Sequence, residues 1–306
     1  MTRWLVYQRE RFPIAAHAPL VAAFSASAVC FSSLLRGDAG VPRPAALLVA
    51  FVTSLLFFLQ LRIADEFKDL AEDSRFRPYR PVPRGLVTLR ELAWVGVGAA
   101  VVQLTLALWL SPPLVLLLLP AWIWFALMSR EFFAPRWLRA HPLAYMASHL
   151  LIVPLIDLYA TACDWRPAGD RSAPAGLAWF LVVSYLNGMV IEIGRKMRAP
   201  ADEEVGVETY SALWGVRGAV HAWLLAILAT GVAAVAASAR IGTGVPTLLM
   251  LVVLAGTCAT VGERFRRDAV PGRGRWIETM AGVWTVLLYV GLGAVPLAFA
   301  VWRGEQ

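Results

Sequence analysis

Hydrophobic residues along this chain gather in nine long segments, which are separated by shorter polar stretches. The segments span roughly residues 14–35, 44–64, 92–111, 113–128, 142–162, 174–194, 217–238, 243–262 and 278–302. A helix needs about 20 apolar residues to cross the hydrocarbon core of a membrane. The pattern therefore predicts an all-α, polytopic membrane protein in which nine transmembrane helices form one bundle. No linker is long enough to separate two domains, so we expect a single domain over residues 1–306.

The composition indicates the same class of protein. Hydrophobic residues make up 59% of the chain, charged residues make up 16%, and the mean hydropathy is +0.63. A soluble domain carries about 25% charged residues. The three cysteines lie in or near apolar segments without metal-ligand spacing, so we expect them to pack in the interior.

The basic residues are distributed unevenly between the two sides that nine spans define. Of the 28 Lys and Arg residues, 22 fall at the N-terminus and around the loops after the second, fourth, sixth and eighth spans. Positively charged loops stay on the cytoplasmic side. We therefore expect the N-terminus and these loops to be cytoplasmic, in a bacterial-type inner (plasma) membrane. This excess and its attraction to membrane lipid explain the net charge of +7, so no nucleic-acid partner is expected.

The end of the second apolar segment carries a cluster of acidic residues. Asp65, Asp69 and Asp73 are spaced i, i+4, i+8, which places them along one face of a helix, with Glu66 alongside. Carboxylates at a membrane edge are costly unless they are paired or bound to a cation. Mg²⁺, or Mn²⁺ in its place, is the cation that such oxygen ligands favour, together with phosphate. The cluster therefore predicts a metal–diphosphate site.

The loop that follows supplies basic residues and turn signals. Lys68, Arg80 and Arg84 are candidates for neutralising phosphate oxygens. Prolines 78, 81 and 83 favour an extended path. Thr88, with Glu91 three residues later, predicts the cap of a short helix over residues 86–92.

A second acidic cluster ends the sixth apolar segment. Glu192 is followed by Arg195, Lys196 and Arg198, and then by a stretch of three acids that begins at Asp202. Alternating acids and bases suit a metal ion with a multiply charged anion. The alternative is a solvated loop whose charges pair with one another, which we favour for Glu203 or Glu204 taken alone. Asn187 lies about one and a half turns before Glu192 and is expected to face the same cavity.

Both clusters resemble the two signatures of the UbiA superfamily of intramembrane prenyltransferases. Residues 65–73 and 80–85 resemble the first signature, Asn-Asp-x-x-Asp-x-x-x-Asp followed by Arg-Pro-x-x-Ser-Gly, and residues 192–215 resemble the second. Asp65 stands where the family has Asn, Glu66 and Glu192 stand where it has Asp, and Arg84 stands where it has Ser. Lys196 stands where some members have another Asp.

The resemblance implies a Mg²⁺-dependent enzyme that moves a prenyl group from an isoprenyl diphosphate to a lipophilic or aromatic acceptor. The expected catalytic residues are Asp65, Asp69, Asp73, Glu192 and Lys196. The expected substrate-binding residues are Lys68, Arg80, Arg84, Asn187, Arg195 and Arg198. The expected metal ligands are Asp65, Glu66, Asp69, Asp73, Glu192 and Asp202.

Two other functions remain open. A terpene cyclase on the same scaffold would close the prenyl cation on itself, without an acceptor. A transporter would need charged residues at mid-membrane in several helices, whereas the acids here gather at helix ends. Asp157 and His149 lie within the fifth segment. We interpret Asp157 as a residue near the outer membrane surface that is hydrogen-bonded to a neighbouring helix, and His149 as a core residue.

The charge distribution makes a direct prediction about topology. Reporter fusions near residue 80 and after residue 306 should report opposite sides of the membrane, with the residue 80 fusion in the cytoplasm. Alkaline phosphatase and fluorescent-protein activities measure this. Activity on the same side for both fusions would contradict the count of nine spans.

Overall fold

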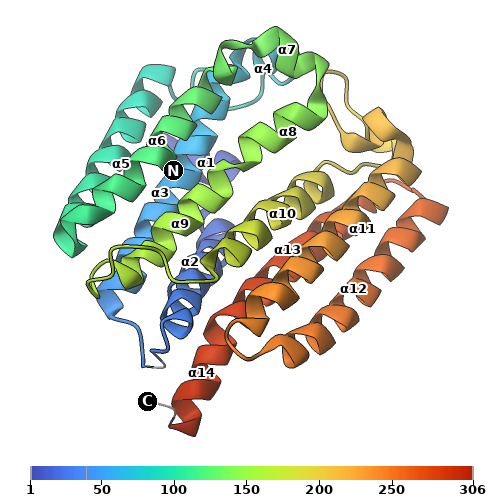
Figure 1. The fold of residues 1–306 in the computed structure, drawn as a ribbon. Helices are drawn as coiled ribbons and strands as arrows, with labels where there is room; N and C mark the ends of the chain where they lie inside the picture. The colour runs from blue at the N-terminus through green and yellow to red at the C-terminus, as the bar shows by residue number, and fades with distance from the viewer. Residues whose placement is uncertain (1, 39, 305–306) are drawn as a thin grey trace. The chain divides into compact units, whose positions relative to one another are not determined.

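The computed structural model describes residues 2–38 and 40–304, which form helices without any β-strand among them (Figure 1). Nine helices or helix pairs in this part of the chain are long and apolar enough to cross a membrane, as the sequence predicted. They are Ile14–Leu35, Pro44–Lys68, Leu89–Leu110, Pro112–Ser129, Pro142–Trp165, Leu177–Arg195, Tyr210–Ala239, Gly244–Arg267 and Gly274–Arg303. The all-α, nine-span prediction is therefore confirmed.

Contacts between residues divide the chain into two compact units. The first unit comprises residues 1–29 and 42–172, and the second comprises residues 30–41 and 173–306. The assignment of residues 1–306 to a single domain stays a prediction.

The first unit is built around α3 (Pro44–Lys68), which packs against α5 (Leu89–Leu110) and α9 (Ile152–Trp165). Its other helices are α1 (Arg3–Arg11), most of α2 (Ile14–Leu35), α4 (Leu70–Phe76), α6 (Val115–Ser129), α7 (Pro135–Ala140) and α8 (Pro142–Leu150), with short 3-10 turns η1 (Pro112–Leu114) and η2 (Glu131–Phe133). Figure 1 shows α3, α5, α6 and α9 side by side. The predicted fifth span is divided into α8 and α9 at Leu151.

The start of α5 shows where the sequence prediction was right and where it was wrong. Thr88 caps the helix, its side chain accepts a hydrogen bond from the Glu91 backbone, and the Glu91 carboxylate accepts one from the Thr88 backbone. This capping box is the one predicted. The separate helix over residues 86–92 is not present, because α5 begins at Leu89 and continues into the third span without a break.

The N-terminal helix α1 is a further element, which the hydrophobic pattern did not predict. Tyr7 is buried with Ile63, Val87 and Leu92, in a cluster that joins α1 to α3 and to the start of α5. Burying an aromatic side chain contributes about 2–3 kcal/mol. The packing holds α1 against the end of α3, where the first acidic cluster lies.

The second unit consists of α10 (Leu177–Arg195), η3 (Pro200–Asp202), α11 (Tyr210–Ala239), α12 (Gly244–Arg267), α13 (Gly274–Leu292), α14 (Ala294–Arg303) and the end of α2. Helix α10 packs against α11 and α13. Gly194 allows this close approach, because a Cβ atom there would lie 2.8 Å from Cβ of Ala281 and 3.2 Å from Nε1 of Trp223. The contact fixes the end of α10, which carries Glu192.

Large apolar side chains are exposed on the outer helices of both units. Val101 on α5 is 58% exposed, and Val253 on α12 is 69% exposed. A water-soluble surface rarely carries extended apolar patches of this kind. Together with the nine spans, they identify an integral membrane protein whose helices face lipid.

Candidate active site

The three aspartates of the first cluster lie on successive helical turns at the end of α3. Helix α3 ends at Lys68, and Asp69 is both its C-cap and the residue that precedes α4. The Asp69 N–H donates to the Asp65 carbonyl at 2.8 Å, and the Asp73 N–H donates to the Asp69 carbonyl at 2.8 Å. The predicted i, i+4, i+8 spacing is thus present, although the chain bends at Asp69. Asp73 falls in the first turn of α4, where the helix dipole favours negative charge.

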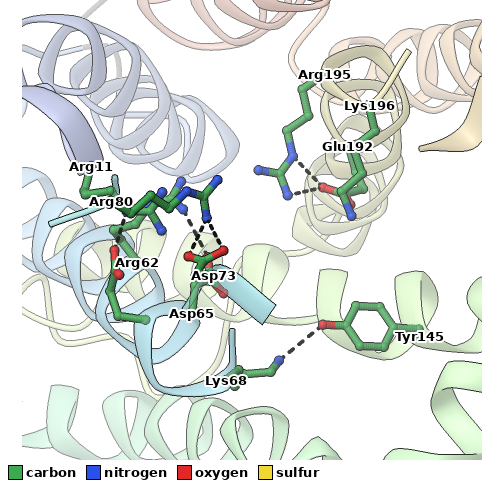
Figure 2. Close-up of polar contacts among 11 residues, drawn as sticks. Arg11, Arg62, Asp65, Lys68, Asp73, Arg80, Tyr145, Glu192, Arg195 and Lys196 are labelled. Carbon is green, nitrogen blue, oxygen red and sulfur yellow. Dashed lines mark hydrogen bonds and ion pairs between the residues drawn. The ribbon is translucent and has the colours of Figure 1, made fainter. Parts of the chain in front are cut away.

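Asp73 is buried and paired with two arginines that follow it in the chain, and Figure 2 shows the pair with Arg80. Arg80 Nη1 lies 2.8 and 2.6 Å from the two carboxylate oxygens, and Arg77 Nε lies 3.0 Å from Oδ1. Sequence reasoning assigned Asp73 to metal and Arg80 to diphosphate. In this structure the two groups bind each other, and the ion pair folds the proline-containing loop back onto α4.

Glu66 is also buried, and its partner is Arg11 of α1. Glu10 accepts a hydrogen bond from Arg84 at 2.9 Å, so α1 is joined to the acidic cluster and to the loop after it. Glu66 was predicted as a metal ligand and Arg84 as a substrate-binding residue. The structure gives each of them a partner on α1, a helix whose role the sequence did not indicate.

Asp65, Asp69 and the exposed Glu72 lack the short arginine pairs that Glu66 and Asp73 have in the described part of the chain. Asp65 is 47% exposed, and its basic partner among the described residues is Arg62, at 3.5 Å. Among the described residues, no basic group lies within ion-pair distance of Asp69. Burial, and then the charges of Asp65, Asp73 and Glu72, raise the pKa of Asp69 to about 6. Two crowded carboxylates of this kind fit a divalent cation, which removes the repulsion that raises the pKa.

Lys68 belongs to a second polar group, which sequence reasoning missed. Its Nζ lies 2.5 Å from Oε1 of Glu131 in η2, 3.2 Å from the hydroxyl of Tyr145 and 3.3 Å from Nε2 of His149. Figure 2 shows the Lys68–Tyr145 contact. His149 was interpreted as a core residue and Glu131 was not considered, because a single Glu after the fourth span gives no local signal of the helix that it meets. Lys68 contacts these groups in the structure, and its predicted role in binding phosphate stays a prediction.

The backbone that carries Glu131 is strained. Glu131, Phe132 and Phe133 have φ angles of 50°, 50° and 57°, in the left-handed region that favours glycine. Residues held there cost about 1–3 kcal/mol each and persist only where the surroundings fix them. Packing of the Phe132 ring against Trp124 and His149 is one such constraint. In this backbone conformation the Glu131 carboxylate lies beside Lys68.

Glu192, the first acid of the second cluster, is paired with two basic residues of its own helix end (Figure 2). Arg195 Nη2 lies 2.6 Å from Oε2, and Lys196 Nζ lies 2.8 Å from Oε1. Both carboxylate oxygens therefore face positive charge. Arg195 and Lys196 sit at the C-terminal end of α10, where the helix dipole favours cations.

The remaining acids of the second cluster make contacts within the second unit. Asp202 Oδ2 accepts a hydrogen bond from the Gly272 N–H at 2.7 Å. Glu204 pairs with Arg198 at 2.8 Å. Glu203 accepts a hydrogen bond from Thr209, the residue that caps α11. These contacts agree with the solvated, internally paired loop that the sequence left open for Glu203 and Glu204.

Asn187, predicted to face a substrate cavity, is buried on α10. Its side-chain oxygen accepts a hydrogen bond from Thr285 of α13 at 3.2 Å. The contact joins two packed helices, and a role of Asn187 in substrate binding stays a prediction. Within residues 2–38 and 40–304, no three His, Cys, Asp or Glu side chains converge as a ready-made metal site. A metal held by Asp65 and Asp69 would take its other ligands from water and phosphate.

Comparison with known proteins establishes the family. Residues 25–277 match the UbiA prenyltransferase family, and the chain belongs to that family. The fold is similar to that of the apo structure of a UbiA homolog from Aeropyrum pernix K1, with a TM-score of 0.66 and 15% sequence identity. The match covers 95% of this chain and 98% of that chain. No curated protein gives a significant sequence match.

The Glu131 group makes a prediction about pH. Burial would raise the pKa of Glu131, but the hydrogen bonds from His149 and Lys68 outweigh it and hold the pKa below its usual range. A lowered pKa stabilises the fold above the ordinary glutamate value of about 4.3, and the stabilisation is lost as pH falls through the lowered value.

Glu131→Gln should therefore lower the free energy of unfolding at pH 7 by about 1–2 kcal/mol, which lowers the unfolding temperature. The difference in unfolding temperature between the variant and the wild type should become smaller below about pH 4. Thermal unfolding in detergent at both pH values measures this. The control Glu208→Gln replaces an exposed acid and should change neither value. A deficit that persists unchanged at low pH would contradict the ion pair.

Proposed function

We propose that this protein is a Mg²⁺-dependent membrane prenyltransferase, which moves a prenyl group from an isoprenyl diphosphate to an aromatic or other lipophilic acceptor. The observation that carries the proposal is the crowding of Asp65 and Asp69 at the end of α3. Their neighbours in the cluster, Glu66 and Asp73, are neutralised by arginines, whereas Asp69 has a pKa of about 6 and no ion-pair partner in the described chain. Membership of the UbiA prenyltransferase family supports the reaction class.

Asp65 and Asp69 would hold the metal ion. When bound, Mg²⁺ supplies charge stabilisation to the diphosphate as it leaves. The reaction breaks the bond between the allylic carbon and the diphosphate oxygen. It forms a bond from that carbon to the acceptor, and the acceptor loses one proton. The chain positions the two carboxylates through the bend at Asp69 and through the arginine pairs of their neighbours.

The surroundings also suit a lipophilic substrate. Apolar helices pack on both sides of α3. Such surroundings would exclude water from a reactive allylic cation and would let a long prenyl tail lie against lipid. We place the reaction at the cytoplasmic end of the spans, on the side where basic residues are in excess.

A binding experiment tests the proposal without knowledge of the acceptor. Geranylgeranyl S-thiolodiphosphate, a diphosphate analogue that resists ionisation, should raise the unfolding temperature of the protein in lipid nanodiscs only when Mg²⁺ is present. Asp69→Asn should abolish the shift, because it removes a charged ligand. Glu72→Gln, which alters an exposed acid of the same cluster, should retain it.

Equal stabilisation in EDTA, or an unchanged shift in Asp69→Asn, would contradict the metal assignment. Incubation of membranes with radiolabelled geranylgeranyl diphosphate then separates the reaction types. A prenylated lipid-soluble product supports transfer. A cyclic hydrocarbon formed without any acceptor would identify a cyclase instead.

A further inference from the structure

The two acidic clusters differ in how their charges are neutralised. In the first cluster, Asp69 has no basic group within ion-pair distance among the described residues, and Asp65 meets Arg62 only at 3.5 Å. In the second cluster, both oxygens of Glu192 are occupied, by Arg195 at 2.6 Å and by Lys196 at 2.8 Å. Asp69 in the first cluster therefore lacks a neutralising cation, whereas Glu192 in the second cluster is already neutralised by Arg195 and Lys196.

The position of Lys196 leaves little room for a metal ion at Glu192. Lys196 follows Glu192 by one helical turn, and its ammonium group lies at hydrogen-bonding distance from Oε1 of Glu192. A divalent cation on the same oxygens would have to displace this ammonium group and overcome repulsion from it and from Arg195. The glutamate side chain is only 15% exposed, so solvent screens that repulsion weakly.

The other acids of the second cluster are no better suited to a metal. Asp202 Oδ2 is held by the Gly272 N–H at 2.7 Å, and Glu204 is paired with Arg198 at 2.8 Å. The Thr209 hydroxyl donates a hydrogen bond to the Glu203 carboxylate and accepts one from the Ala212 N–H at the start of α11. Glu203 and Glu204 thus make contacts within their own loop, and Asp202 joins this loop to the loop between α12 and α13.

Lys196 is also fixed in place by its surroundings. It is the C-cap of α10, its carbonyl accepts a hydrogen bond from the Tyr210 N–H at 3.0 Å, and its Nζ lies 5.9 Å from the centre of the Tyr210 ring. The helix dipole and the aromatic face both favour a positive charge at this point. These contacts favour a positively charged side chain beside Glu192.

We propose that this protein binds a single divalent cation, at Asp65 and Asp69, and that the Lys196 ammonium group takes the place of a second metal ion at Glu192. The inference rests on the proposed function, because it assumes that the first cluster binds metal. It assigns Glu192 to the positioning of Lys196, in place of the metal-ligand role expected from the sequence.

Counting bound metal tests this inference directly. The full chain in phosphatidylcholine nanodiscs is equilibrated with Mn²⁺ and geranylgeranyl S-thiolodiphosphate and then desalted, and Mn²⁺ per protein is measured by atomic emission. We expect one ion per protein. Asp69→Asn should weaken Mn²⁺ binding by more than about tenfold. Glu192→Gln should retain the single ion, with an affinity within about twofold of the wild type.

The variant Lys196→Asp tests the same inference in the opposite direction, because it should create a second metal site. It removes the ammonium group, leaves Glu192 in place and adds a carboxylate one turn away, so it should bind a second Mn²⁺ ion. Lys196→Gln, which removes the charge without adding a ligand, should still bind one. Size-exclusion elution and helical circular dichroism confirm that each variant is folded.

The outcomes separate the inference from the proposed function. Two ions in the wild type, or loss of the ion in Glu192→Gln, would overturn the inference while leaving metal-dependent diphosphate binding intact. A single ion in Lys196→Asp would overturn the role given to Lys196. No Mn²⁺ in the wild type would overturn the proposed function, and the inference with it.

Discussion

The structure depends on ion pairs that neutralise the carboxylates at the ends of its apolar helices. A buried, unpaired charge costs several kcal/mol, so each such group needs a partner or a cation. Glu66 has Arg11, Asp73 has Arg77 and Arg80, and Glu192 has Lys196. Removing one member of such a pair is more damaging than the pair itself is stabilising. The arginine pairs also set the geometry, because they fix α1 and the loop after α4 around the end of α3.

Asp69 departs from this pattern. Burial, and then the charges of the neighbouring carboxylates, raise its pKa to about 6, and no arginine or lysine in the described chain lies within ion-pair distance of it. Such local cost is tolerated where a function requires it, and perturbed carboxylates are frequent at functional sites. We interpret the neutralised acids, Glu66 and Asp73, as structural residues, and we propose that Asp65 and Asp69 bind the ligand. The strained turn at Glu131, whose carboxylate forms an ion pair with Lys68, has a structural role of the same kind.

Much of the fold could be predicted from the sequence, because hydrophobic period and length determine a transmembrane helix locally. The nine spans and the Thr88–Glu91 capping box followed from short-range rules. Partner choice could not be predicted in this way. Arg11 lies 55 residues from Glu66 in sequence, and Lys68 lies 81 residues from His149, so only the packing of helices brings them together. The sequence therefore placed the charged residues at helix ends, whereas the ion pairs between distant helices came from the structure, and the binding roles of these residues stay predictions.

The most direct test of this account is the position of the metal ion itself. Crystals or frozen particles of the protein with Mn²⁺ and geranylgeranyl S-thiolodiphosphate would show the ion by anomalous scattering or as map density. The account predicts Mn²⁺ in contact with the carboxylates of Asp65 and Asp69 and with the diphosphate, while Arg80 remains on Asp73. A metal ion bound elsewhere, with Asp69 free of it, would contradict the central claim.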